Sequence, residues 1–264
     1  MNKLDGHLNV RRYGADGSPV MMLHGFTLTG AMFEPVADRT TLSVHAPDLP
    51  GHGKTTVHPT FPETVKSLAD YLRDFGPMPV VGYSLGGRIG VQVAIEHPEL
   101  VPLLILISAS FGIQDVQERA DRAAREIALA KSIRAGSIEG FVDRWLTHPV
   151  AAPCGLDDAT KAWDRSVRLE NTSDGLAAAL QGLGQGEQEW LGDAAQSLPM
   201  HIITVTGSRD AKYSSLAAAW CAAADPDGPS RCHVVVPRAG HNLIVEQPDH
   251  VAPLIENLVK SDSP

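Results

Sequence analysis

The pentapeptide Gly82-Tyr83-Ser84-Leu85-Gly86 carries the strongest evidence about the fold of this chain. It follows the apolar run 78–81 and precedes a helix-like stretch, 85–97. When Gly-x-Ser-x-Gly lies between a strand and a helix, its small residues permit a sharp turn that exposes the serine hydroxyl at the helix N-terminus. This turn is called a nucleophile elbow. The pentapeptide alone fits an ordinary glycine-rich turn of a parallel sheet equally well, so the surrounding chain must decide.

Short aliphatic runs, separated by turn residues and helix-like stretches, recur on both sides of this motif. The predicted strands are 19–23, 42–46, 79–82, 103–108, 201–206 and 233–237. Apolar residues at mixed three and four spacing predict helices over 64–75, 85–97, 214–224 and 250–258. This alternation is typical of βαβ units, whose right-handed crossovers place helices on both sheet faces. We therefore predict an α/β fold with a mostly parallel central sheet.

The alternation stops between residues 111 and about 191. This segment has no convincing strand run and is rich in Ala, Arg, Glu and Gln. Its clearest predicted helices are 117–135 and 138–146, and Pro149 and Pro153 mark a break after them. We predict a helical lid of residues 111–192, inserted into a core formed by 1–110 and 193–264 and packed against it.

The composition limits the classes of partner. The 264 residues are 43% apolar and 20% charged, which is typical of a soluble globular protein. The net charge of −9 opposes binding to nucleic acid or to an anionic membrane. The apolar stretch 101–109 is about half a bilayer span, and the N-terminus lacks a signal-like apolar run. Cys154, Cys221 and Cys232 form no C-x-x-C pair, which favours a reducing, cytoplasmic setting without a thiolate metal site.

Three residues that follow predicted strands point to nucleophilic chemistry. Ser84, Asp210 and His241 come in this order along the chain, each after a strand. A serine activated by a histidine, which an aspartate orients, is the arrangement of a catalytic triad. The backbone N–H groups of Phe26 and Leu85 are the expected oxyanion-hole donors. The alternatives are that Asp210 caps the following helix and that His241 is a structural loop residue.

The chain has 11 histidines, and most of them are expected to serve no catalytic purpose. His52 lies in a loop at the carboxyl edge of the predicted sheet, where ligands bind in α/β folds, and it stays open as a ligand-binding or turn residue. We expect a structural or solvent-facing role for His7, His58, His97, His148 and His250.

Four segments together resemble the α/β-hydrolase superfamily. They are Leu23-His24-Gly25-Phe26, Asp48-Leu49-Pro50-Gly51-His52-Gly53, Gly82-Tyr83-Ser84-Leu85-Gly86-Gly87 and Gly240-His241 with Glu246 and Pro248. The resemblance implies the α/β-hydrolase fold with an inserted helical lid. That fold hosts many chemistries, so the function needs further residues.

A second set of residues is similar to the MenH family, the 2-succinyl-6-hydroxy-2,4-cyclohexadiene-1-carboxylate synthases of menaquinone biosynthesis. The likeness runs from about residue 20 to 248 and includes the lid. The residues that carry it are Arg88, Arg119-Ala120-Asp121-Arg122, Trp145, Arg168 with Asn171, Arg209-Asp210-Ala211-Lys212-Tyr213 and Pro237-Arg238-Ala239-Gly240-His241-Asn242.

This resemblance implies an elimination in place of a hydrolysis. Pyruvate leaves 2-succinyl-5-enolpyruvyl-6-hydroxy-3-cyclohexene-1-carboxylate after proton abstraction by Ser84, which His241 and Asp210 activate, and no acyl-enzyme forms. The partner is a small multi-carboxylate substrate, and no cofactor or metal is expected. The family's substrate-contacting positions fall on Tyr83, Arg88, Arg122, Trp145 and Arg168.

The residue types agree with such a substrate, because arginine binds carboxylates through a planar, bidentate fork. Arg119, Arg122 and Arg125 are spaced by three, near one helical stripe. We expect Arg119 and Arg125 on a solvated face, paired with neighbouring acids. Trp145 is equally well explained as part of the buried stripe of a lid helix.

Two other functions remain open at this stage. The first is a carboxylester or carbon–carbon bond hydrolase that uses the same triad. Arginines that converge on one pocket would argue against a hydrolase of neutral esters. The second is a binding protein or receptor without catalysis, against which the intact Ser84, Asp210 and His241 argue.

Overall fold

The computed structural model describes residues 6–14, 16–148, 150–152 and 155–261. Pro149, Pro153 and Cys154 lie outside these residues. The sheet has the order β1-β3-β2-β4-β5-β6-β7, and β1 alone runs antiparallel to its neighbour. Its strands are β1 (Val10–Tyr13), β2 (Pro19–Leu23), β3 (Ser43–Pro47), β4 (Val80–Tyr83), β5 (Leu103–Ile107), β6 (His201–Gly207) and β7 (Arg231–Val236). The prediction of an α/β fold with a mostly parallel sheet is confirmed.

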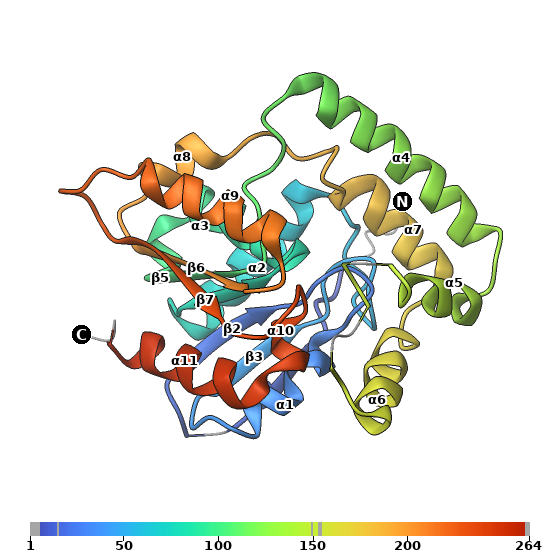
Figure 1. The fold of residues 1–264 in the computed structure, drawn as a ribbon, viewed down its shortest axis with the longest axis horizontal. Coiled ribbons are helices and arrows are strands. Elements are labelled where there is room, and N and C mark those ends of the chain that lie inside the picture. Colours follow the sequence, from blue (N-terminus) through green and yellow to red (C-terminus); the bar gives the residue numbers. More distant parts are fainter. Residues whose placement is uncertain (1–5, 15, 149, 153–154, 262–264) are drawn as a thin grey trace.

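Helices cover both faces of this sheet (Figure 1). Side chains of α2 (Phe61–Phe75), α3 (Leu85–Glu96), α8 (Gly192–Gln196) and α9 (Ala211–Ala222) form one core cluster with alternate strand residues. The other face packs against η1 (Gly30–Phe33), α1 (Glu34–Ala37), α10 (Leu243–Glu246) and α11 (Pro248–Ser261). The short η2 (Pro98–Leu100) leads from α3 into β5. Leu104 and Leu106 of β5 enter the first cluster and Ile105 the second, as the period of two in a strand requires.

The segment between β5 and β6 is helical, as expected. It contains α4 (Val116–Arg134), α5 (Ile138–Trp145), α6 (Asp158–Arg168) and α7 (Ser173–Leu183). A third apolar cluster joins α4, α5 and α7 through Ile133, Phe141 and Leu176, and Figure 1 shows α4 and α7 side by side. Ala195 of α8 belongs to the core cluster. The lid boundary predicted at residue 192 therefore falls where a core helix begins, and the division into lid and core stays a prediction.

The sequence patterns did not predict the edge strand β1 or several short helices, and they placed the start of one long helix too late. The edge strand β1 carries Arg11 and Arg12 in its middle and therefore lacks an apolar run. Helix α2 begins three residues before its predicted start, because Thr60 accepts a hydrogen bond from the N–H of Glu63 and caps it. Short helices such as α1, α8 and α10 span too few turns to show a period.

Candidate active site

Ser84 lies at a sharp turn between β4 and α3. Its φ of 50° and ψ of −107° are strained for a residue with a side chain. A Cβ on Gly82 would lie 2.4 Å from Cα of Gly87, and one on Gly86 would lie 2.1 Å from the carbonyl oxygen of Leu23. The turn therefore requires glycine at both positions, which distinguishes an elbow from an ordinary glycine-rich turn.

The structure brings Ser84, His241 and Asp210 together. Nδ1 of His241 lies 2.7 Å from Oδ2 of Asp210, and Nε2 lies 3.2 Å from Oγ of Ser84. Asp210 occupies the N-cap position of α9, but its side chain makes no capping hydrogen bond. The alternative of a helix cap is therefore wrong. When the Nδ1–H donates to Asp210, the lone pair of Nε2 is free to accept the serine proton.

Two backbone N–H groups lie near Ser84 without an acceptor. The hydrogen bonds of the described residues include none from the N–H of Phe26 or of Leu85. Leu85 is the first residue of α3, where an N–H has no partner inside the helix. A Cβ on Gly25 would lie 2.6 Å from the Tyr83 ring and 3.6 Å from Cβ of Ser84, so the loop that carries Phe26 packs against the elbow. Both groups are available to an oxyanion.

Two buried histidines hold the loops around this site. Nε2 of His24 accepts the N–H of Leu49 at 2.8 Å, and Nε2 of His52 accepts the N–H of Thr27 at 3.3 Å. Burial lowers the pKa of His24 to about 4 and that of His52 to about 3. Both rings are therefore neutral acceptors at pH 7. His52, left open by the sequence, positions the residue after Phe26.

We expect these two histidines to make the protein less stable in mild acid. An unfolded histidine binds a proton below about pH 6.5, whereas the folded His24 and His52 resist protonation down to about pH 4 and pH 3. The unfolded state then binds more protons, and each ring lowers the free energy of unfolding by about 1.4 kcal/mol per pH unit below pH 6.5. Guanidinium unfolding at pH 7.5, 6 and 5 measures this slope.

In His52→Gln, whose amide oxygen can still accept the N–H of Thr27, the slope below pH 6.5 should be smaller. The exposed His250 supplies the control, since His250→Gln should leave the slope unchanged. An equal slope in His52→Gln and the wild type would contradict the assignment.

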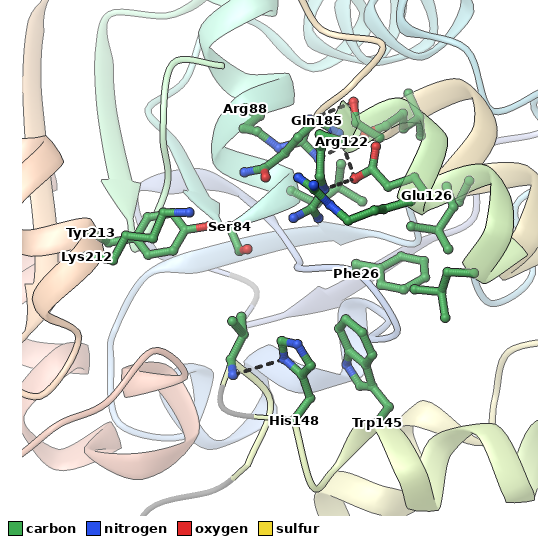
Figure 2. A pocket seen from close by; sticks show the side chains of 18 residues that line it. Phe26, Ser84, Arg88, Arg122, Glu126, Trp145, His148, Gln185, Lys212 and Tyr213 are labelled. Atoms are coloured by element: carbon green, nitrogen blue, oxygen red, sulfur yellow. Dashed lines mark hydrogen bonds and ion pairs between the residues drawn. The ribbon is translucent and has the colours of Figure 1, made fainter. Parts of the chain in front are cut away.

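A cavity of about 350 Å³ lies over Ser84, between the sheet and the helices α4–α7, which are called the lid from here on (Figure 2). Ser84 and Leu85 form part of its core side, and α4, α5 and α7 contribute from the lid. Arg88, Arg122 and Trp145, three of the predicted substrate-contacting residues, line it. The ring of Trp145 stands edge-on to Phe26 at 5.5 Å between centroids, so Trp145 both packs in the lid and borders the cavity.

Arg88 and Arg122 are held differently. Arg88 is buried and donates to the carbonyl oxygens of Leu183 and Gly184 and to Oε1 of Gln188. These partners are neutral, and although burial lowers the pKa of Arg88 to about 10, it is a cation at pH 7. Nε of Arg122 lies 2.7 Å from Oε1 of Glu126, so its charge is paired.

Tyr83 and Arg168 lie apart from that cavity. They line a smaller space of about 40 Å³ with Trp145, Ser84 and His241. Arg168 is buried, makes an ion pair with Asp164 and donates to the hydroxyl of Thr27. Burial raises the pKa of Tyr83 well above its usual value, so the phenol stays neutral. The five predicted substrate residues therefore do not converge on one cavity, since Arg168 is buried with Asp164 of its own helix against Thr27.

We expect Arg168→Ala to act mainly on stability. The change leaves the buried carboxylate of Asp164 unpaired, which costs about 3–5 kcal/mol. Urea unfolding should therefore show a large loss of stability, and every activity of the site should fall together. Replacing both partners, in Arg168→Met with Asp164→Leu, should recover most of the stability. A variant of normal stability that loses only the turnover of carboxylate substrates would contradict this role.

Of the 18 residues that line the main cavity, 12 were not predicted as site residues, and they include Arg125, His148, Gln185, Lys212 and Tyr213. One expectation needs correction. Arg125 is exposed, as expected for a solvated face, yet it borders the cavity, because the spacing by three that places it beside Arg122 also directs it there. His148 is exposed and stacks on Trp145 at 5.2 Å between centroids, in agreement with the structural or solvent-facing role expected for it. Arg119 lines neither of the cavities beside Ser84 and donates to the carbonyl oxygen of Ile113.

Two absences concern the described part of the chain. It contains no group of three or more His, Cys, Asp or Glu side chains placed to bind a metal ion. Within those same residues, no helix combines the length and the apolar character that a membrane span needs.

A serine elbow, an orienting Asp–His pair and two free N–H groups at the carboxyl edge of a parallel sheet are the features of α/β hydrolases. The chain belongs to the alpha/beta hydrolase family, whose model matches residues 20–254. A 2-succinyl-6-hydroxy-2,4-cyclohexadiene-1-carboxylate synthase of Enterobacter sp. (strain 638) is 30% identical and covers 94% of this chain and 95% of its own.

The chain is also similar to an esterase and to a solved MenH structure. A pimeloyl-[acyl-carrier protein] methyl ester esterase of Chromobacterium violaceum is 32% identical and covers 92% of this chain and 94% of its own. The structure of MenH from S. aureus superposes with a TM-score of 0.88 at 24% identity, covering 97% of this chain and 98% of its own. The family model therefore establishes the family, and the structural likeness agrees with the fold.

Proposed function

We propose that this protein is a carbon–oxygen lyase of menaquinone biosynthesis. It eliminates pyruvate from 2-succinyl-5-enolpyruvyl-6-hydroxy-3-cyclohexene-1-carboxylate to give 2-succinyl-6-hydroxy-2,4-cyclohexadiene-1-carboxylate, without a cofactor. The observation that carries the proposal is Arg88, a buried cation with neutral partners in the cavity over Ser84. The synthase relative at 30% identity supports the same reaction.

Ser84 acts as the base in this reaction. His241 accepts the serine proton at Nε2, while Asp210 holds the ring and stabilises its positive charge. The serine oxygen then removes the proton beside the succinyl ketone. Negative charge develops on the ketone oxygen, where the N–H groups of Phe26 and Leu85 are available as donors.

Collapse of that charge completes the elimination. The electron pair moves through the ring, the carbon–oxygen bond to the enolpyruvyl group breaks, and enolpyruvate takes up a proton to become pyruvate. No bond forms between Ser84 and a substrate carbon. Arg88 and Arg122, which line the same cavity, bind substrate carboxylates, and Trp145 borders the substrate ring. Tyr83 and Arg168 form the wall behind Ser84 and support the loop that carries Phe26.

The free cysteines and the net charge support a cellular location and a kind of partner for this reaction. Cys221 and Cys232 are free thiols, which supports a reducing, cytoplasmic location. The net charge of −9 argues against nucleic acid as a partner, and the substrate is a small molecule.

The second candidate is the hydrolysis of carboxylic esters, which the esterase relative at 32% identity favours. One assay separates the two. The enolpyruvyl substrate is made in situ by the preceding enzyme of the pathway, and pyruvate release is followed beside the hydrolysis of a short p-nitrophenyl ester. We expect pyruvate release to be the faster reaction. Efficient ester hydrolysis without pyruvate release would replace the lyase by an esterase.

A further inference from the structure

A second cavity of about 390 Å³ lies next to the one over Ser84 and shares part of its wall. We call the two the inner and the outer cavity, and their shared wall the junction. The junction consists of Arg122, Arg125 and Gln185 of the lid and of Lys212 and Tyr213 of the core. Figure 2 shows Lys212 and Tyr213 on one side of Ser84 and Arg122 on the other. A ligand at the junction would therefore contact both the lid and the core.

The junction carries positive charge that the protein does not neutralise. Arg122 pairs with Glu126, but Arg125 and Lys212 have no acidic partner among the described residues. Nζ of Lys212 lies 5.9 Å from the ring centroid of Tyr213, a neutral neighbour. The acids of the outer cavity are Asp115 and Glu118, and the carboxylate of Asp115 already caps α4.

Lys212 also occupies an unfavourable place in its helix. It is the second residue of α9, whose first turn contains no acidic residue. The positive end of a helix dipole disfavours a cation in that turn. A lysine there lowers the stability of the free protein slightly, and a bound anion would reverse this effect.

We propose that Arg125 and Lys212 bind the terminal carboxylate of the substrate's succinyl arm at the junction, while the ring lies in the inner cavity. This inference rests on the proposed function. The succinyl arm ends in a carboxylate two methylenes from its ketone, so it reaches away from the reacting carbon. Arg88 and Arg122 serve the carboxylates nearer Ser84, and the arm's carboxylate joins α4 of the lid to α9 of the core.

The probe is 4-oxo-4-phenylbutanoate, which attaches the same arm to an aromatic ring and has no other carboxylate. Its Kd is measured by titration calorimetry with the wild-type protein, with Arg125→Gln, with Lys212→Gln and with the double variant. Since both side chains are exposed, we expect each single change to weaken binding about five- to tenfold and the double change more. Thermal unfolding without ligand should show no loss of stability in Lys212→Gln, because the helix dipole disfavours the lysine.

Two controls isolate the carboxylate and the position. Butyrophenone lacks the carboxylate and should bind all variants alike. Lys131→Gln removes an exposed cation of α4 that lines neither cavity, and it should leave the Kd unchanged. An unchanged Kd in the double variant, equal binding of butyrophenone and the acid, or an equal loss in Lys131→Gln would each overturn the proposal.

Turnover supplies a separate measurement. With the true substrate, the double variant should raise KM at least about tenfold with kcat nearly unchanged, because the contact is remote from the reacting atoms. A fall in kcat at constant KM would contradict this role. Failure of the proposed function would appear differently, as a wild-type protein that binds the probe but releases no pyruvate.

Discussion

Ser84→Ala is expected to lower kcat for pyruvate release by about three to six orders of magnitude. The change removes the oxygen that lies 3.2 Å from Nε2 of His241 and that serves as the base in the proposed reaction, and Ser84 lines the inner cavity. Triad members act as a unit, so the loss of one removes most of the rate. Single-turnover assays with substrate made in situ measure the effect, and circular dichroism verifies the fold.

His241→Ala and Asp210→Asn test the same relay. Each should lower kcat strongly, and a double change with Ser84→Ala should cost little more, because the effects are not additive. Mass spectrometry of the wild-type enzyme during turnover should show no substrate-derived adduct on Ser84, since a base forms no acyl-enzyme. Pyruvate release near the wild-type rate by Ser84→Ala would end the serine-base mechanism.

Arg88→Ala should lower kcat/KM for the carboxylate substrate about ten- to a hundredfold, the effect of losing a charge-assisted contact in a buried site. Arg88→Lys should rescue poorly, because an ammonium cannot reach Leu183, Gly184 and Gln188 and also present a planar fork to a ligand. Hydrolysis of a neutral p-nitrophenyl ester should change little. Initial rates over a range of both substrates provide the comparison.

Arg88 also ties α3 to the lid, and a matched variant separates this structural effect. Gln188→Leu removes one hydrogen bond to the guanidinium but keeps its charge in the cavity. We expect it to affect the carboxylate and the ester substrate equally and mildly. If Gln188→Leu reproduced the selective loss of Arg88→Ala, the role of Arg88 would be structural.

Local sequence patterns were sufficient to predict the central strands of the sheet and the nucleophile Ser84. The strands are short aliphatic runs that are buried on both faces, so β2, β4, β5 and β6 lie close to their predicted positions. The Gly-x-Ser-x-Gly elbow depends on residues adjacent in sequence, since Gly82 and Gly86 leave room for the backbone of their own turn and of β2. Asp210 and His241 were predicted for a related reason, because parallel strands deliver the loops that follow them to one edge of the sheet.

The division of the arginines depended on packing between segments far apart in the chain. Arg122 and Arg168 each pair with an acidic residue one helical turn away, but Arg122 lines an open cavity, whereas Arg168 is buried against the distant Thr27. The sequence predicted that Arg125 lies on a solvated face. The tertiary structure adds that Arg125 of α4 and Lys212 of α9 line the same two cavities. Sequence periodicity identifies the face of a helix on which a side chain lies. What packs against that face depends on tertiary contacts between residues more than 80 positions apart in the chain, such as Arg168 and Thr27.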